Sequence, residues 1–85
     1  STVASTTTID AKSDIVYVTG TTAVATINPG LGTAQSQLCI LIPTSGSVVL
    51  GTTGNILVGI TAVINRAVYL VWSKQLQKWV INSGV

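Results

Sequence analysis

Apolar residues along the chain form short runs that glycine and proline separate. Valine, isoleucine and threonine dominate these runs, and their branched side chains favour extended backbone. No segment of about eleven or more residues keeps an apolar stripe at helical spacing. The pattern therefore predicts an all-β protein, a small antiparallel sandwich or barrel-like domain of about six to eight short strands.

The expected strands follow from the apolar runs and the turn residues between them. In chain order they are residues 14 or 15 to 18, 22–27, 37–42, 47–50, 55–58, 66–73 and 78–82. The turn at 19–21 should join the first two strands as a hairpin, and the polar turn at 74–77 should join the last two. Asn28-Pro29-Gly30 should end strand pairing, because proline lacks a ladder donor and glycine tolerates positive φ. Residues 59–65 give the weakest signal of the chain.

Several expected strands are apolar on both faces, which one-sided burial would not require. The two faces of residues 66–73 carry Val68, Leu70 and Trp72 on one side and Ala67, Tyr69 and Val71 on the other. Residues 15–18 and 38–42 show the same pattern. A second sheet of the same chain, another subunit or a host surface could cover the additional face.

Composition points toward assembly. Six of the 85 residues are charged, and the chain has no histidine, glutamate, methionine or phenylalanine. Because a soluble domain usually devotes about a quarter of its residues to charge, we expect other protein to cover part of this surface. One cysteine and no histidine leave no intrachain disulfide and no ordinary zinc site, so oligomerisation remains as the means of supporting a small core.

Other partner classes find little support in the residues. The four basic residues are scattered, whereas a nucleic-acid surface gathers them in a patch, so we expect no nucleic-acid binding. The longest apolar runs fall far short of the ~20 residues of a membrane span, and residues 1–13 do not have the pattern of a signal peptide. We expect neither a membrane partner nor a cofactor, and synthesis in the cytoplasm.

Candidate chemistry is sparse, and we expect no enzymatic activity. Asp10 and Asp14 flank Lys12, which favours a solvated row of charges over a paired acid and base. Cys39 lies in an apolar run without a neighbouring cation, which favours a buried thiol over a nucleophile. The serines and threonines lack a Gly-x-Ser-x-Gly elbow and a histidine base, so no catalytic or metal-binding residue is assigned.

Four segments together resemble a recurrent module of tailed-bacteriophage structural proteins. They are VTGTTAVATI (18–27), LGTTGNI (50–56), AVYLVW (67–72) and KW (78–79), and the resemblance covers residues 14–82. It implies a small threonine-rich β-domain that associates as a trimer on the virion surface. Such modules occur in tail fibres, tailspikes, and capsid decoration or head-fibre proteins.

The favoured hypothesis is a homotrimeric capsid decoration protein, made in the host cytoplasm and located on the virion surface, where it stabilises the shell by binding the major capsid protein or another virion protein. The chain should divide into a flexible N-terminal arm at 1–13 and a single β domain at 14–85, without an elongated fibre repeat. The expected oligomer interface contains Tyr17, Val24, Tyr69, Val71, Trp72 and Trp79. The expected capsid-contacting residues of the arm are Thr6, Thr7, Thr8 and Ile9.

Two alternatives remain open. One is a trimerisation or receptor-binding domain of a tail fibre or tailspike, in which Tyr69, Trp72 and Trp79 meet host glycans. The other is a monomeric carbohydrate-binding module, which would display its aromatic residues as an exposed platform.

Overall fold

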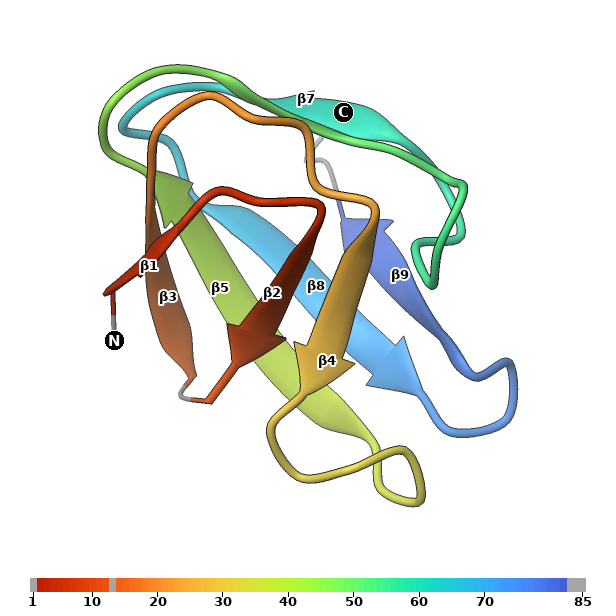
Figure 1. Cartoon of the computed structure of the whole chain (residues 1–85). Helices are drawn as coiled ribbons and strands as arrows, with labels where there is room; N and C mark the ends of the chain where they lie inside the picture. The colour runs from red at the N-terminus through yellow and green to blue at the C-terminus, as the bar shows by residue number, and fades with distance from the viewer. Residues whose placement is uncertain (1, 13, 83–85) are drawn as a thin grey trace.

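Nine β-strands build the structure, a computed structural model that describes residues 2–12 and 14–82 (Figure 1). The strands are β1 (Thr2–Ala4), β2 (Thr8–Ala11), β3 (Ile15–Thr19), β4 (Thr26–Pro29), β5 (Gln37–Pro43), β6 (Val48–Leu50), β7 (Ile60–Ala62), β8 (Val68–Ser73) and β9 (Lys78–Asn82). The predicted all-β class is confirmed. The described part of the chain contains no helix, and so none that is long and apolar enough to cross a bilayer.

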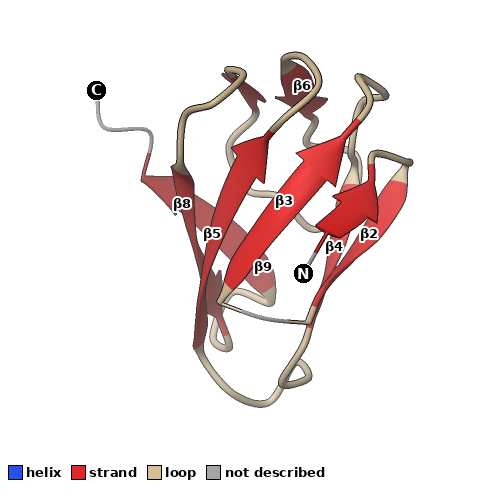
Figure 2. Cartoon of the chain, turned by 90° about the vertical axis from the view of Figure 1, so that its left-hand side faces the viewer, coloured by secondary structure: helices blue, strands red, loops and turns tan. Residues whose placement is uncertain are grey.

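The strands form one large sheet and two small ones. The large sheet has the order β1-β3-β5-β8-β9, in which β1, β3 and β5 are parallel while β5, β8 and β9 are antiparallel. β2 pairs parallel with β4, and β6 pairs antiparallel with β7. Figures 1 and 2 show β2 and β4 as a second layer that faces the large sheet. The sheet is therefore mixed rather than antiparallel as predicted.

The C-terminal hairpin lies where the sequence predicted it. β8 and β9 pair antiparallel around the turn at 74–77, with Trp72 opposite Trp79. The strands predicted at 37–42 and 47–50 are also confirmed, as β5 and β6. Apolar runs bounded by turn residues were a sufficient signal for these elements.

The hairpin predicted between residues 15–18 and 22–27 is wrong. β3 exists, but its partners are β1 and β5, both parallel. After Gly20, whose φ of 77° is in the left-handed region, the chain crosses to the other layer, where β4 pairs with β2. Pairing continues through Asn28 and Pro29, because β4 pairs on one side only and proline is tolerated on an edge strand.

The N-terminal segment belongs to the domain rather than to a separate arm. β1 pairs with β3, and β2 pairs with β4 in the register Ile9 to Ile27. Ile9 and Ala11 are buried in the core. These two buried side chains hold β2 against the core, although two apolar residues in a threonine-rich segment give only a weak sequence signal for a strand. The strand predicted at 55–58 is reduced to a single bridge from Ile56 to Trp79.

The core lies between the large sheet and the β2–β4 layer. Its largest side chains are the indoles of Trp72 and Trp79, whose ring centres lie 5.5 Å apart at an interplanar angle of 68°. This edge-to-face arrangement is favoured between aromatic rings. The buried Gln37 ties the loop after β4 and the end of β2 to the same core, because it accepts from the Leu31 N–H at 3.1 Å and donates to the Ala11 carbonyl at 3.2 Å.

Asn55 links the two layers by hydrogen bonds. Its side-chain amide pairs with Ile27 of β4 in both directions, accepting from the backbone N–H at 2.9 Å and donating to the carbonyl at 2.6 Å. Its own backbone carbonyl accepts from the Trp79 N–H of β9 at 2.7 Å. The preceding residue has to be small, since a Cβ on Gly54 would collide with the carbonyl oxygen of Ala25.

We therefore predict that Asn55→Ala destabilises the chain by about 1–3 kcal/mol, because it leaves both polar groups of Ile27 without this partner. Urea unfolding followed by tryptophan fluorescence measures the change. Asn28→Ala is the matched control. The Asn28 side chain is exposed, and the one hydrogen bond described for it is to Asp10. Removing this side chain should therefore lower the free energy of unfolding by less than about 0.5 kcal/mol. Equal losses for the two variants would contradict the role given to Asn55.

Candidate assembly surface

The large sheet presents a second apolar face on the side away from the core. Alternation along its strands sends one set of side chains inward and the other outward. The outward apolar side chains, hereafter the outer sheet face, are Ile15, Tyr17, Leu38, Ile40, Ile42, Tyr69, Val71 and Val80. Six of these eight are exposed, with Leu38 at 52% and Tyr69 at 47% the most open, and the other two are half-buried.

Strand register makes this face continuous. Ile40 of β5 lies between Ile15 of β3 and Tyr69 of β8. One step along the sheet, Leu38, Val71 and Val80 form a second row across β5, β8 and β9. Side chains at directly opposed positions of neighbouring strands are in contact range. The outer sheet face is therefore one apolar surface across four strands rather than a set of scattered residues.

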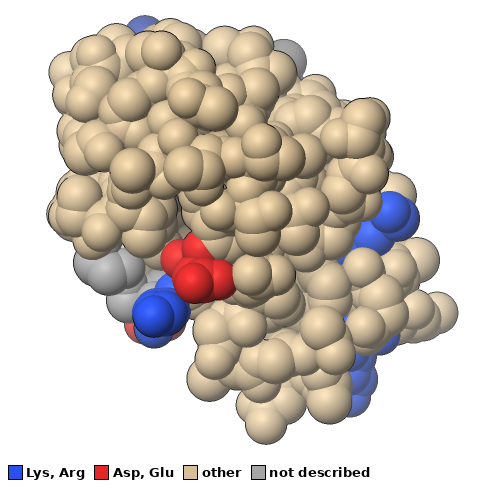
Figure 3. Space-filling model, in the orientation of Figure 1, with Lys and Arg blue, Asp and Glu red and all other residues tan. Residues whose placement is uncertain are grey.

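The β2–β4 layer shows the opposite character on its outward side. Thr8, Asp10 and Asn28 are exposed there, and the Asn28 amide donates to the Asp10 carboxylate at 2.8 Å. Figure 3 shows this side of the molecule, with charged side chains at its lower left and along its right margin. Ile9 and Ala11 alternate with these polar residues and face the core. The chain therefore uses polar side chains where this layer meets water.

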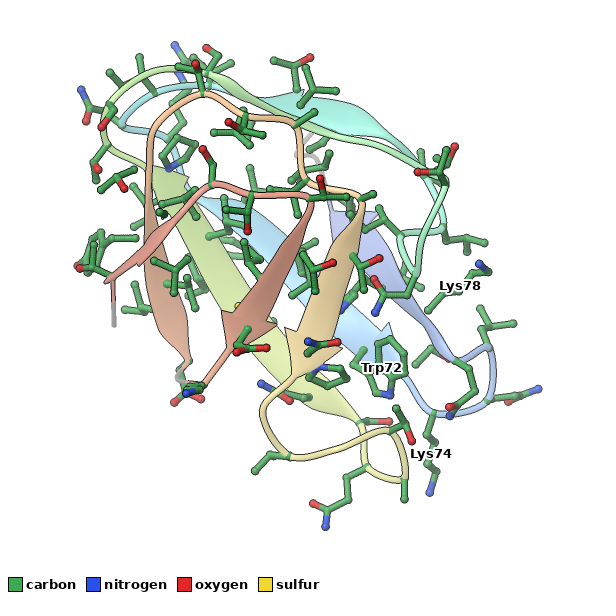
Figure 4. The ribbon with its side chains drawn as sticks, viewed as in Figure 1. Trp72, Lys74 and Lys78 are labelled. Carbon is green, nitrogen blue, oxygen red and sulfur yellow. The ribbon has the colours of Figure 1, made fainter. Side chains whose placement is uncertain are left out.

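Charge is confined to the margin of the outer sheet face. Lys78 begins β9 at the margin of the sheet and is half-buried, and its Nζ lies 3.3 Å from the carbonyl oxygen of Gly54 (Figure 4). Within residues 2–12 and 14–82, no other charged side chain belongs to a strand of the large sheet. Another protein could therefore cover the middle of this face without burying an unpaired charge.

The predicted interface residues separate into two groups. Tyr17, Tyr69 and Val71 belong to the outer sheet face, with exposed fractions of 40%, 47% and 43%. The other three are enclosed by the chain itself, and we correct their placement to the core: Val24, Trp72 and Trp79.

The indoles are held inside by hydrogen bonds as well as by packing. Trp72 Nε1 donates to the Thr33 carbonyl at 3.2 Å, and Trp79 Nε1 donates to the Ile27 carbonyl at 2.7 Å. Figure 4 shows Trp72 near the end of β8, and the side chain is 2% exposed. Sequence reasoning did not assign Ile15, Leu38 or Val80 to the interface, although they alternate with buried neighbours. The period-two pattern would have found them once the inward side of each strand was known.

The predicted capsid-contacting residues are engaged within the chain. Ile9 is 4% exposed, and Thr8 pairs with Thr26 in the β2–β4 ladder. The carbonyl of Thr7 accepts from the N–H groups of Ala25 and Thr26 at 2.9 and 3.0 Å. The Thr6 hydroxyl donates to the Thr8 carbonyl at 2.6 Å. These residues would have to leave their own fold before they could add a strand to a neighbour.

Cys39 is a packed thiol. It is 1% exposed and belongs to the core. Burial raises the pKa of the Cys39 thiol from 9.0 to about 11, and the negative charge of Asp14 adds to the shift. The group is therefore protonated at neutral pH, whereas nucleophilic cysteines require the thiolate. The described residues contain no group of three or more side chains suited to hold a metal ion.

No family model, curated protein or solved structure matches the chain.

We predict that Cys39 makes the chain less stable at alkaline pH. Between pH 9 and 11 the unfolded chain has lost the thiol proton while the folded chain keeps it, so stability is fully present below pH 9 and falls as pH rises. The slope reaches as much as about 1.4 kcal/mol per pH unit. Urea unfolding at pH 8 to 11 should show this slope for the wild type and a shallower one for Cys39→Ala, in which all other titrating groups remain. Parallel curves would contradict the prediction.

Proposed function

We propose that this chain is a structural protein of a bacteriophage virion, a homotrimeric decoration protein whose copies associate through the outer sheet face and bind the major capsid protein. The observation that supports it most is the continuous, uncharged apolar surface across β3, β5, β8 and β9. The number of copies, three, and the location on a virion come from the resemblance of residues 14–82 to trimeric modules of virion proteins.

Incomplete folding does not account for the exposed face. The accessible surface of the chain is 4604 Å², close to the roughly 4700 Å² expected for a folded monomer of this mass. The chain has therefore buried as much surface as a protein of its size normally does, and the apolar face remains outside. A standard interface of about 800 Å² per partner would cover about a sixth of that surface.

Assembly through this face would give the chain a mechanical role. Association would remove Tyr17, Tyr69 and Val71 from water, which is the main favourable contribution to most protein association. Tyrosine is also enriched in such interfaces. The polar β2–β4 layer would remain in water, and the assembled trimer would hold neighbouring capsid subunits by several weak contacts at once. No cofactor is needed for this role.

We do not assign capsid contact to an added N-terminal strand. Residues 6–9 already bond within the chain, through the β2–β4 ladder and the Thr7 carbonyl. We instead assign capsid contact to surface that the trimer leaves exposed.

The carbohydrate-binding alternative loses its principal residues. An aromatic platform needs exposed rings, but Trp72 and Trp79 are 2% and 0% exposed. Tyr17 and Tyr69 remain as the exposed aromatics of the described residues, and they lie among aliphatic side chains of the outer sheet face. A tail-fibre or tailspike trimerisation domain could use the same face, so capsid binding has to distinguish it from a decoration protein.

We predict that Tyr69→Lys abolishes self-association, because it places a charge in the middle of the proposed interface. Native mass spectrometry at low micromolar concentration should show a trimer for the wild type and a monomer for the variant, with unchanged circular dichroism for both. Thr8→Lys is the matched control, since it adds the same charge at an exposed strand position of the polar layer, and should remain trimeric. A wild type that stays monomeric up to tens of micromolar would refute the proposal.

We further predict that the wild-type trimer binds undecorated capsids of the virus that encodes it. Co-sedimentation of the chain with purified empty shells measures binding, and decorated shells should survive higher temperature than bare ones. A trimer that leaves the shells bare and unstabilised would favour the fibre or spike domain.

A further inference from the structure

The N-terminal segment, residues 2–11, runs beside the part of the chain that follows it. β1 pairs in parallel with β3, and β2 pairs in parallel with β4, so the segment lies along residues 17–29 on both layers (Figure 1). At the corner between the layers the Ser5 N–H donates to the Thr19 carbonyl at 2.7 Å, and the Ser5 hydroxyl accepts from the Thr22 N–H at 3.0 Å. The edge formed by β3 and β4, hereafter the β3–β4 edge, is therefore a binding site whose occupant the structure shows.

The N-terminal segment and the strands that it binds have similar sequences. VASTT (3–7) corresponds to VTGTT (18–22), and TID (8–10) corresponds to TIN (26–28). The register places the like residues directly opposite one another: Val3 and Val18, Thr8 and Thr26, Ile9 and Ile27, and Asp10 and Asn28. The last pair is also joined by the 2.8 Å hydrogen bond from the amide to the carboxylate. The site therefore matches a segment of this particular sequence, which every copy of the chain carries.

Close contacts make the site selective for shape as well. Ile9 and Ala11 of the N-terminal segment are buried in the core. A Cβ on Gly20 would lie only 2.8 Å from the Ser5 hydroxyl oxygen. A Cβ on Gly30 would collide with the Ala11 carbonyl oxygen. Each glycine leaves room for one point of the segment, so a strand that is merely apolar would not match the site.

Both strands of the β3–β4 edge have support besides the N-terminal segment. β3 pairs with β5 on its other side, and the Asn55 side chain bonds to both backbone polar groups of Ile27 in β4. β1 and β2 each pair with one strand only, so no other strand pair breaks when the segment leaves. Thr6, Thr8 and Asp10 of the segment are exposed already. The N-terminal segment is therefore the part of the chain best placed to move from one copy to another.

We propose that the β3–β4 edge of one copy binds the N-terminal segment of a second copy, so that subunits exchange residues 2–11. The contacts in the exchanged form are those of the single chain, and only the path of the connection from Ala11 to Ile15 differs. The partner is a copy of this chain, because the site matches this sequence position by position. Exchange of an identical element is a low-cost route to oligomers, since it requires no contact that the fold lacks.

This inference goes beyond the proposed function and uses a different surface. The outer sheet face points away from the core, whereas the exchanged segment occupies one edge of both layers. Exchange around a ring of three copies would fill every β3–β4 edge, so it is compatible with a trimer. Such subunits would be linked by strand pairs as well as by apolar contact.

Disulfide trapping tests the exchange. Two full-length chains both carry Cys39→Ala, and one also has Asp10→Cys while the other has Asn28→Cys. Each chain then has a single cysteine, and directly paired positions of neighbouring strands are within disulfide range. The two chains can therefore link through the β2–β4 ladder only when the segment of one lies on the other. After refolding together and mild oxidation, peptide mass spectrometry should find the 10–28 disulfide between chains.

The matched control pair is Val49→Cys with Thr61→Cys, in the same Cys39→Ala background. These exposed residues also face each other directly, on β6 and β7, in a part of the chain that does not exchange. We expect about ten times more linked product from the 10–28 pair than from the control pair. A single chain with both Asp10→Cys and Asn28→Cys confirms that the two positions link, and circular dichroism confirms that every variant is folded.

The outcomes separate the exchange from the proposed function. Equal yields from the 10–28 pair and the control pair would overturn the exchange, while the proposed function would stand, since the outer sheet face does not depend on it. If the 10–28 disulfide forms between chains but Tyr69→Lys assembles as the wild type does, the exchange is upheld. The outer sheet face is then not the interface between subunits, and the proposed function fails.

Discussion

The arrangement of the whole molecule depends on the hydrogen bonds that converge on the carbonyl of Ile27. That oxygen accepts from the Asn55 side chain at 2.6 Å and from the Trp79 indole at 2.7 Å. Through Asn55, whose backbone also bonds to Trp79, the β2–β4 layer is attached to the last strand of the large sheet. The buried indole of Trp79 then packs edge-to-face on Trp72. Once Trp72 points inward, alternation along β8 requires Tyr69 and Val71 to point outward.

One filled core leaves a second apolar face without cover. An 85-residue chain has enough residues for two layers around one core, and here β2 and β4 supply the second layer on the inner side of the large sheet. Nothing in the described part of the chain covers the opposite side. The outward positions of β2 are threonine and aspartate, whereas those of β8 include tyrosine and valine. This contrast between the strands is the observation on which the proposed contact with another protein rests.

Local patterns predicted the elements better than their partners. The hairpin of β8 and β9 could be read from an apolar run, a polar turn and a second run, because its pairing is local. The parallel pairs of β3 with β5 and of β2 with β4 join segments that are distant in the sequence. No local sequence pattern identifies which strand each of them pairs with. Alternation showed that β8 has two apolar faces but not which one turns inward, so Trp72 was expected at the interface. The role of Asn55 was hidden because a Gly-Asn pair is also an ordinary turn sequence.

The two edges of the large sheet are less suited than its outer face to the proposed association. Self-association of β-proteins often proceeds by pairing of exposed edge strands. Along β9, the Trp79 N–H donates to the Asn55 carbonyl and the Trp79 carbonyl accepts from the Leu57 N–H at 3.0 Å, so the chain occupies part of its own edge. At the other edge β1 spans only three residues, Thr2–Ala4, and short edge strands are poor templates for pairing. With one edge partly occupied and the other short, the broad apolar surface across β3, β5, β8 and β9 is the part of the sheet best able to bind another subunit.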